Sequence, residues 1–170
     1  MKVILGLGNP GVEYANTRHN AGIMLVDVLS AKCQGLSSYG WRREKNKMVF
    51  KTNDFTLIKT ANVFMNESGY LTLNPSPNLG EGQNFFVAHD DLDLRLGHYK
   101  IQKGVGPKLH NGIESVEKAL KTKDFWRIRI GIDNRITPVD GETYVLQRFS
   151  PEERKILDSV LENIVKAVMP

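Results

Sequence analysis

Strand-like and helix-like apolar patterns alternate along the 170-residue chain, and this alternation limits the folds that it can adopt. Apolar runs bounded by turn residues predict strands, and apolar positions spaced three and four apart predict helices. The predicted strands span 2–7, 48–52, 55–60, 85–88, 97–103 and 126–132, and the predicted helices span 20–33, 66–73, 113–120 and 151–168. Strands interleaved with helices, together with one hairpin over 48–60, predict an α/β fold with a sheet of mixed strand direction.

Length and composition predict a single domain over 1–170, because 41% of the residues are hydrophobic and 25% are charged. The formal net charge of +4 is compatible with an anionic partner such as nucleic acid, and equally with an ordinary solvated surface. Cys33 is the single cysteine, so no internal disulfide forms. The first residues resemble a core strand rather than a leader, and no apolar run approaches the ~18 residues of a membrane span. We therefore expect a reduced, cytoplasmic location and no membrane partner.

Two segments carry clear local signals. Ser150, Pro151 and Glu153 form a capping box with proline at the first helical position, so the last helix is predicted to begin there. The segment 34–47 is polar, basic and contains glycine, and it is predicted to be a loop. Its basic run over 41–45 is interpreted as solvated, with contact to a nucleic-acid partner as the alternative.

The sequence GLGNPG at residues 6–11 matches the dinucleotide-binding pattern G-x-G-x-x-G directly after the first predicted strand. A dinucleotide site also needs a helix that begins at the third glycine and an acidic residue after the next strand. Gly11 is followed by VEYANTRHN, which has no apolar helical stripe, and Asp27 falls inside a predicted helix. We therefore expect a sharp turn after the strand and no bound cofactor.

Polar residues capable of chemistry stand where one predicted element gives way to the next. They are Asn9, His19, Asn66, Asp90 and Asn111. Because the carboxyl ends of strands meet at one edge of an α/β sheet, we expect these side chains to line one cleft. His19 is a candidate general base, because its ordinary pKa of ~6.5 leaves the side chain largely neutral at pH 7. Asp90 would fix the His19 tautomer and stabilise the imidazolium.

Six short motifs follow one another along the chain. They are GLGNPG, Tyr14 with Thr17-Arg18-His19-Asn20, Phe64-Met65-Asn66-x-Ser68-Gly69, His89-Asp90-Asp91-Leu92-Asp93-Leu94, His110-Asn111-Gly112 and Arg127-Ile128-Arg129-Ile130-Gly131-Ile132. In this order and spacing they resemble the bacterial-type peptidyl-tRNA hydrolases, from residue 3 to the last helix. The resemblance implies a twisted mixed β-sheet surrounded by helices. It also implies a monomeric, metal-free and cofactor-free esterase that cleaves the ester joining a peptide to the terminal ribose of tRNA.

The resemblance implies roles for further residues. Asn9 and Asn66 would orient the water, the peptide backbone or the terminal nucleotide, and Asn111 would position the water or the developing oxyanion. Tyr14 would contact the substrate. The residues implied to hold a tRNA phosphate are Lys100, Lys103 and Arg129.

The chain departs from the family pattern in the loops that would meet substrate. Pro107, Lys108 and Leu109 replace a run of glycines, which predicts a stiffer and bulkier loop. Gln102 aligns near the lysine that the family uses with an arginine to clamp phosphate. These departures leave open a second hypothesis, a catalytically weak or inactive hydrolase-like protein that binds RNA.

Other polar residues receive structural interpretations. His89 is expected to be a buried structural histidine. His110 has the family's position beside Asn111, with packing as its alternative role. Asp91 and Asp93 have the character of a metal pair, but no third ligand stands at coordinating spacing, so a structural or solvated role is favoured. Asn66 has helix capping as its alternative role.

Overall fold

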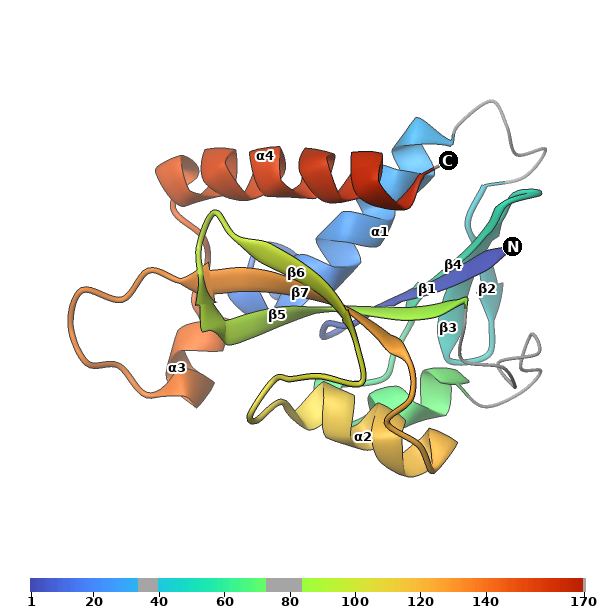
Figure 1. Cartoon of the computed structure of the whole chain (residues 1–170), viewed down its shortest axis with the longest axis horizontal. Coiled ribbons are helices and arrows are strands. Elements are labelled where there is room, and N and C mark those ends of the chain that lie inside the picture. Colours follow the sequence, from blue (N-terminus) through green and yellow to red (C-terminus); the bar gives the residue numbers. More distant parts are fainter. Residues whose placement is uncertain (34–39, 73–83, 170) are drawn as a thin grey trace.

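The computed structural model describes residues 1–33, 40–72 and 84–169, and in these residues a seven-stranded sheet lies between two layers of helix (Figure 1). The strands are β1 (Lys2–Gly6), β2 (Arg42–Glu44), β3 (Lys47–Lys51), β4 (Phe55–Thr60), β5 (Phe85–Arg95), β6 (Tyr99–Lys103) and β7 (Trp126–Asp133). The helices are α1 (Ala21–Lys32), α2 (Asn111–Leu120), α3 (Gly141–Leu146) and α4 (Pro151–Val168), with 3-10 helices η1 (Arg18–Asn20) and η2 (Met65–Thr72).

The sheet has the order β2-β3-β4-β1-β5-β7-β6 and mixed strand direction. The central strands β4, β1, β5 and β7 are parallel, whereas β2 and β3 extend one edge and β6 the other by antiparallel pairing. The predicted α/β fold with a mixed sheet is confirmed. Four carboxyl ends of parallel strands meet at one edge, where folds of this class place their sites.

Each face of the sheet packs on its own helices (Figure 1). Helices α1 and α4 cover one face, where Ile128 and Ile130 of β7 are buried with Leu161 of α4. Helix α2 and η2 cover the other face, where Leu5 of β1 is buried with Ile113 of α2. Because β7 alternates, its arginines face the α2 side, opposite to its isoleucines.

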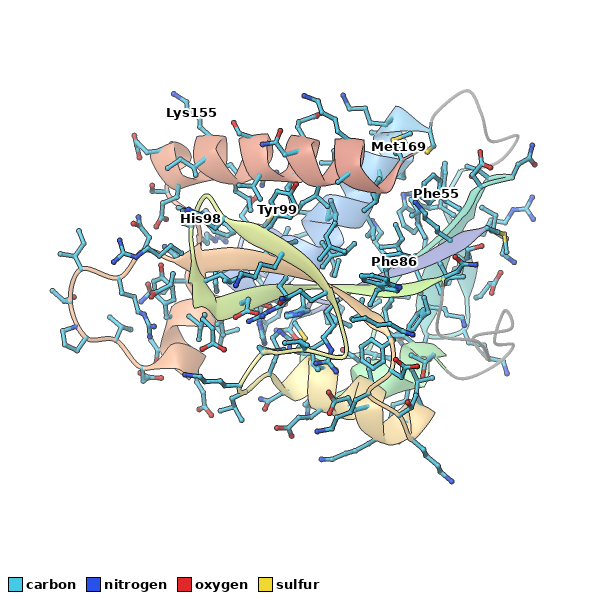
Figure 2. All side chains as sticks on the ribbon, viewed as in Figure 1. Phe55, Phe86, His98, Tyr99, Lys155 and Met169 are labelled. Carbon is cyan, nitrogen blue, oxygen red and sulfur yellow. The ribbon has the colours of Figure 1, made fainter. Side chains whose placement is uncertain are left out.

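The predicted capping box begins α4. The Ser150 Oγ accepts the Glu153 N–H at 3.2 Å, and the Glu153 carboxylate accepts the Ser150 N–H at 2.8 Å. Phe86 and Tyr99 lie on the side of the sheet that faces this helix, and Lys155 lies on its outer surface (Figure 2). The apolar stripe of α4, from Leu157 to Val168, is buried against this face of the sheet.

The glycine-rich segment after β1 turns the chain, as expected. Gly11 has φ 104°, and no α-helix begins before Ala21. Gly22 then lets α1 approach the sheet closely, because a Cβ at this position would lie 2.2 Å from the Ala88 carbonyl oxygen. This approach fixes the start of α1, and with it His19 in the preceding η1.

Three sequence predictions need correction. The segment 34–47 is not simply a loop, since β2 within it pairs with β3 through a turn at Lys45, and residues 34–39 lie outside the described residues. The helix predicted over 66–73 is the 3-10 helix η2, and residue 73 is also outside them. β5 continues to Arg95 instead of ending at Ala88, and α3 was not predicted at all. β2 and the end of β5 consist largely of charged residues, so they lack a continuous apolar strand signal.

Candidate active site

His19 and Asp90 meet at the edge where β1 has ended and β5 continues. The His19 Nδ1 lies 2.9 Å from Asp90 Oδ2 and 3.0 Å from Oδ1. Because the carboxylate accepts, the hydrogen-bond pattern assigns the proton to Nδ1 and leaves the Nε2 lone pair for a reactant. The His19 side chain is 12% exposed and that of Asp90 only 2%. The expected contact between the two is present.

His110 is a third member of this group. Its Nε2 donates to Asp90 Oδ1 at 2.9 Å, and its Nδ1 accepts the N–H groups of Gly112 and Ile113 at 3.1 and 3.2 Å. His110 is thus the N-cap residue of α2. An Nδ1 that accepts two N–H groups carries no proton, so His110 is the neutral Nε2–H tautomer.

Charge and burial set the pKa values of the group. Burial alone would lower the pKa of His19, but the charge of Asp90 and its hydrogen bond outweigh burial and raise this pKa above 6.5. Burial would raise the pKa of Asp90, but attraction and hydrogen bonds from His19 and His110 hold it well below its usual range. Asp90 is therefore ionised in the folded protein at neutral pH.

His89 is buried and structural, as its position suggested. Its Nδ1 donates to the Asp90 carbonyl oxygen at 2.7 Å. Burial first, and the neighbouring His110 second, lower the pKa of His89 to about 3. It stays neutral and does not face the cavity described next.

A cavity of about 270 Å³ opens beside His19 and Asp90. Strand β5, the loop before α2, and α3 form its walls. The lining residues are His19, Asp90, Asp91, Leu92, Asp93, Pro107, Lys108, Leu109, His110, Asn111, Gly141, Glu142 and Val145. The loop that departs from the family pattern therefore forms one wall of the site.

The three asparagines lie in three places: the cavity, the turn after β1 and η2. Asn111 lines the cavity, whereas Asn9 and Asn66 do not. Asn9 is buried, its Oδ1 accepts the Met65 N–H at 2.8 Å, and its own N–H donates to Asn20 Oδ1 at 2.8 Å. Asn66 is exposed directly after Met65. The expected single cleft thus contains three of the five residues, whereas Asn9 lies in the turn after β1 and Asn66 in η2, which hydrogen-bonds to that turn.

Tyr14 stands beside Phe64, the residue directly before η2. Its ring meets Phe64 edge to face with centroids 6.0 Å apart. Phe64 is 47% exposed, so the pair presents apolar surface to solvent. This placement makes the pair available to a substrate without placing it in the cavity.

The three residues expected to hold phosphate are differently placed. Lys100 is exposed and pairs in register with Arg129, so both share the α2 face of the sheet. Lys103 pairs with Trp126 on the opposite face and forms an ion pair with Asp124 at 3.1 Å. Arg129 is buried, and its Nε and one terminal nitrogen already donate to Asp91 and Gln102.

One group in the described residues has metal-ligand types at close spacing. The ligand atoms of His19, Asp90 and His110 lie within 4.8 Å of one another. Their mutual hydrogen bonds account for this closeness. The Asp91 carboxylate accepts the Asp93 N–H and the Arg129 Nε–H, which agrees with the structural role favoured for it.

The sequence pointed to His19, Asp90 and Asn111 but missed the role of His110. A histidine directly before a predicted helix is a weak capping signal, because Ser, Thr, Asp and Asn dominate that position. Among the residues that the structure describes, no helix is both long and apolar enough to cross a membrane.

Comparison with known proteins gives a consistent result. The family model described as peptidyl-tRNA hydrolase matches residues 3–170. The chain is 40% identical over 169 residues to the peptidyl-tRNA hydrolase of Campylobacter concisus, covering 99% of this chain and 87% of that protein. It is 35% identical over 173 residues to that of Aquifex aeolicus, covering 99% and 88%. The crystal structure of peptidyl-tRNA hydrolase from Acinetobacter baumannii superposes with a TM-score of 0.82 at 27% identity, covering 98% and 85%.

Proposed function

The chain belongs to the peptidyl-tRNA hydrolase family, and on that premise we propose that it hydrolyses peptidyl-tRNA with His19 as the general base. The reaction class is carboxylic ester hydrolysis. The observation that carries the proposal is the His19 Nδ1 contact of 2.9 Å with Asp90, beside a cavity that His19 itself lines.

The geometry supports a water attack without a covalent intermediate. The His19 Nε2 takes a proton from water as the water oxygen attacks the ester carbonyl carbon. The tetrahedral intermediate collapses, the ribose hydroxyl leaves with the proton from the imidazolium, and the peptide carboxylic acid is released. Asp90 stabilises the imidazolium in the interval, as the carboxylate does in hydrolytic triads. Asn111 on the cavity wall would position the water or donate to the oxyanion.

His110 supports Asp90 in this scheme. Its Nε2–H gives the carboxylate a second donor, and the capped N-terminus of α2 holds the His110 ring in place. The positive end of the α2 dipole also favours the negative charge of Asp90. The carboxylate is thereby held in one orientation toward His19.

The remaining substrate contacts are proposed from position. Asn9 would act through its fixed amide, Asn66 through an exposed amide and Tyr14 through its half-buried ring. Lys100 would act through an exposed ammonium that attracts phosphate. Lys103 and Arg129 are proposed as further phosphate contacts. Arg129 would give up its hydrogen bond to Asp91 or to Gln102 in order to bind phosphate. The protein is proposed to act as a cytoplasmic monomer in translation.

Turnover of a purified N-acetyl-aminoacyl-tRNA by wild type and His19→Ala tests the proposal. Loss of a general base should lower kcat by about 10²–10⁴-fold, while tRNA affinity stays within a few-fold because phosphate contacts dominate it. The exposed His98 is a matched control, and His98→Ala should keep wild-type kcat. Wild-type kcat in His19→Ala would refute the role of His19. Tight tRNA binding without any wild-type turnover would instead favour the inactive RNA-binding alternative.

A further inference from the structure

Arg18, the residue directly before His19, forms a buried ion pair with α4. The Arg18 side chain is 7% exposed and that of Glu153 is 12% exposed. One terminal nitrogen of Arg18 donates to both Glu153 carboxylate oxygens at 2.9 and 2.7 Å, and the other donates to the Arg148 carbonyl oxygen at 2.7 Å. The guanidinium lies over the Tyr144 ring at 4.2 Å from its centroid. Arg18 is therefore held on several sides, by α3, by the first turn of α4 and by the segment between these two helices.

The backbone around Arg18 is held by the same segment. The Arg18 N–H donates to the Gln147 carbonyl oxygen at 3.0 Å, and the Phe149 N–H donates to the Asn16 carbonyl oxygen at 3.1 Å. Thr17 forms an isolated antiparallel bridge with Arg148. The residues before His19, 16–18, thus pair with residues 147–149 as a short two-stranded contact. The ion pair between Arg18 and Glu153 lies directly beside this contact.

Glu153 has two functions at this point. It is the N3 residue of the capping box, and it accepts from Ser150 N–H, from Asn134 Nδ2 at 3.1 Å and from Arg18. Burial would raise the pKa of Glu153, but these hydrogen bonds and the Arg18 charge lower it, so the carboxylate stays ionised. The Glu153 carboxylate therefore links the N-terminus of α4 and Asn134, directly after β7, to Arg18, the residue before His19.

A buried ion pair is weak evidence for stability, because desolvation offsets much of the attraction between its charges. The effect of the Arg18–Glu153 pair is to fix both side chains in one geometry. Arg18 and Glu153 do not line the cavity, so any effect on the reaction must pass through His19 or the cavity wall. Val145 of α3 lines that cavity directly after Tyr144, which stacks on Arg18.

We propose that Arg18 and Glu153 are positioning residues that couple the α4 N-terminus to the orientation of His19 toward Asp90. The inference rests on the proposed role of His19 as base. Without the carboxylate, Arg18 has an uncompensated buried charge and moves toward solvent, and the η1 backbone follows. The distance between His19 and Asp90 then increases. Asp90 raises the pKa of His19 less at the longer distance, so burial lowers this pKa.

Glu153→Ala and Ser150→Ala are a matched pair for the test. Both weaken the capping box, but only the first removes the partner of Arg18. The His19 imidazole is titrated by NMR in the absence of substrate, and kcat and KM are measured on N-acetyl-aminoacyl-tRNA at a temperature where circular dichroism shows both variants folded. In Glu153→Ala we expect a lower His19 pKa and a kcat lower by about 10–100-fold with KM within about twofold, the scale of a small misplacement of a catalytic group. In Ser150→Ala all three quantities should match wild type.

Glu153→Gln covers the case in which Glu153→Ala does not fold, because it keeps the shape and an acceptor oxygen. It should lose less kcat than the alanine variant and shift the His19 pKa in the same direction. A folded Glu153 variant with the wild-type His19 pKa and kcat would overturn the inference, and so would equal losses in Ser150→Ala. The imidazole titration needs no turnover, so it decides the coupling even if His19→Ala shows that His19 is not the base.

Discussion

Replacing Asp90 with asparagine changes one atom of the site and should reverse its hydrogen bonding. His110 cannot adjust, because its Nδ1 accepts two backbone N–H groups and its Nε2 must therefore donate. The new amide turns its oxygen toward His110 and its NH2 group toward His19. The NH2 group then occupies the Oδ2 position, 2.9 Å from the His19 Nδ1, where a proton on Nδ1 would oppose the amide hydrogens even though the amide oxygen lies 3.0 Å away, so His19 should adopt the tautomer with its proton on Nε2.

The cost follows from this tautomer. A protonated Nε2 cannot take the proton of the attacking water, and no carboxylate remains to stabilise an imidazolium. The same exchange in hydrolytic triads lowers turnover by roughly 10⁴-fold, so we expect kcat to fall by about 10³–10⁴-fold, or about 4–5 kcal/mol of activation free energy. Burial, no longer opposed by the charge of Asp90, should lower the pKa of His19 below 6.5.

Two measurements test this reasoning. Single-turnover hydrolysis at saturating enzyme gives the chemical step, and ¹⁵N shifts of the imidazole report which His19 nitrogen carries the proton. Asp91→Asn is the control, since Asp91 is a buried neighbour on the same strand that pairs with Arg129 and does not contact His19. It should leave the His19 tautomer unchanged. An Asp90→Asn variant that retains the Nδ1–H tautomer, or a rate within threefold of wild type, would refute the account.

Three further predictions follow from the site and the fold. Wild-type kcat/KM should rise with pH through the raised pKa of His19, because the base must lose its proton, and a pH–rate profile that is flat above 6.5 would contradict this. Lys100→Ala should raise KM and reduce the slope of log affinity against log salt by about one unit, whereas Lys155→Ala, on the outer surface of α4, should not; equal salt slopes would disprove the distinction. Gly22→Ala should lower the Tm by more than about 5 °C, since its Cβ would meet the Ala88 carbonyl oxygen at 2.2 Å; calorimetry showing an unchanged Tm would show that α1 can shift freely.

The sheet was largely predictable because its signals are local. The isoleucines of β7 alternate strictly, and the capping box of α4 states where that helix begins. β2 forms by pairing with β3, and nothing in its own three residues identifies it as a strand. Lys100 and Lys103 show a second limit: they flank Gln102 in sequence but face opposite sides of the sheet once the register with β7 is known.

The candidate site was predictable to the extent that residue type alone suggests chemistry. His19 and Asp90 are recognisable because a base and a carboxylate are what direct ester hydrolysis requires. His110 and Arg18 act on this pair through contacts that depend on folding: one needs α2 to offer its N-terminal N–H groups, and the other needs α4 to bring Glu153 across the chain. The functions of His110 and Arg18 depend on which hydrogen-bond donors and acceptors the folded backbone places next to their side chains. Only the three-dimensional structure therefore assigns these functions. A sequence therefore identifies the reacting groups more readily than the residues that fix their tautomer and orientation.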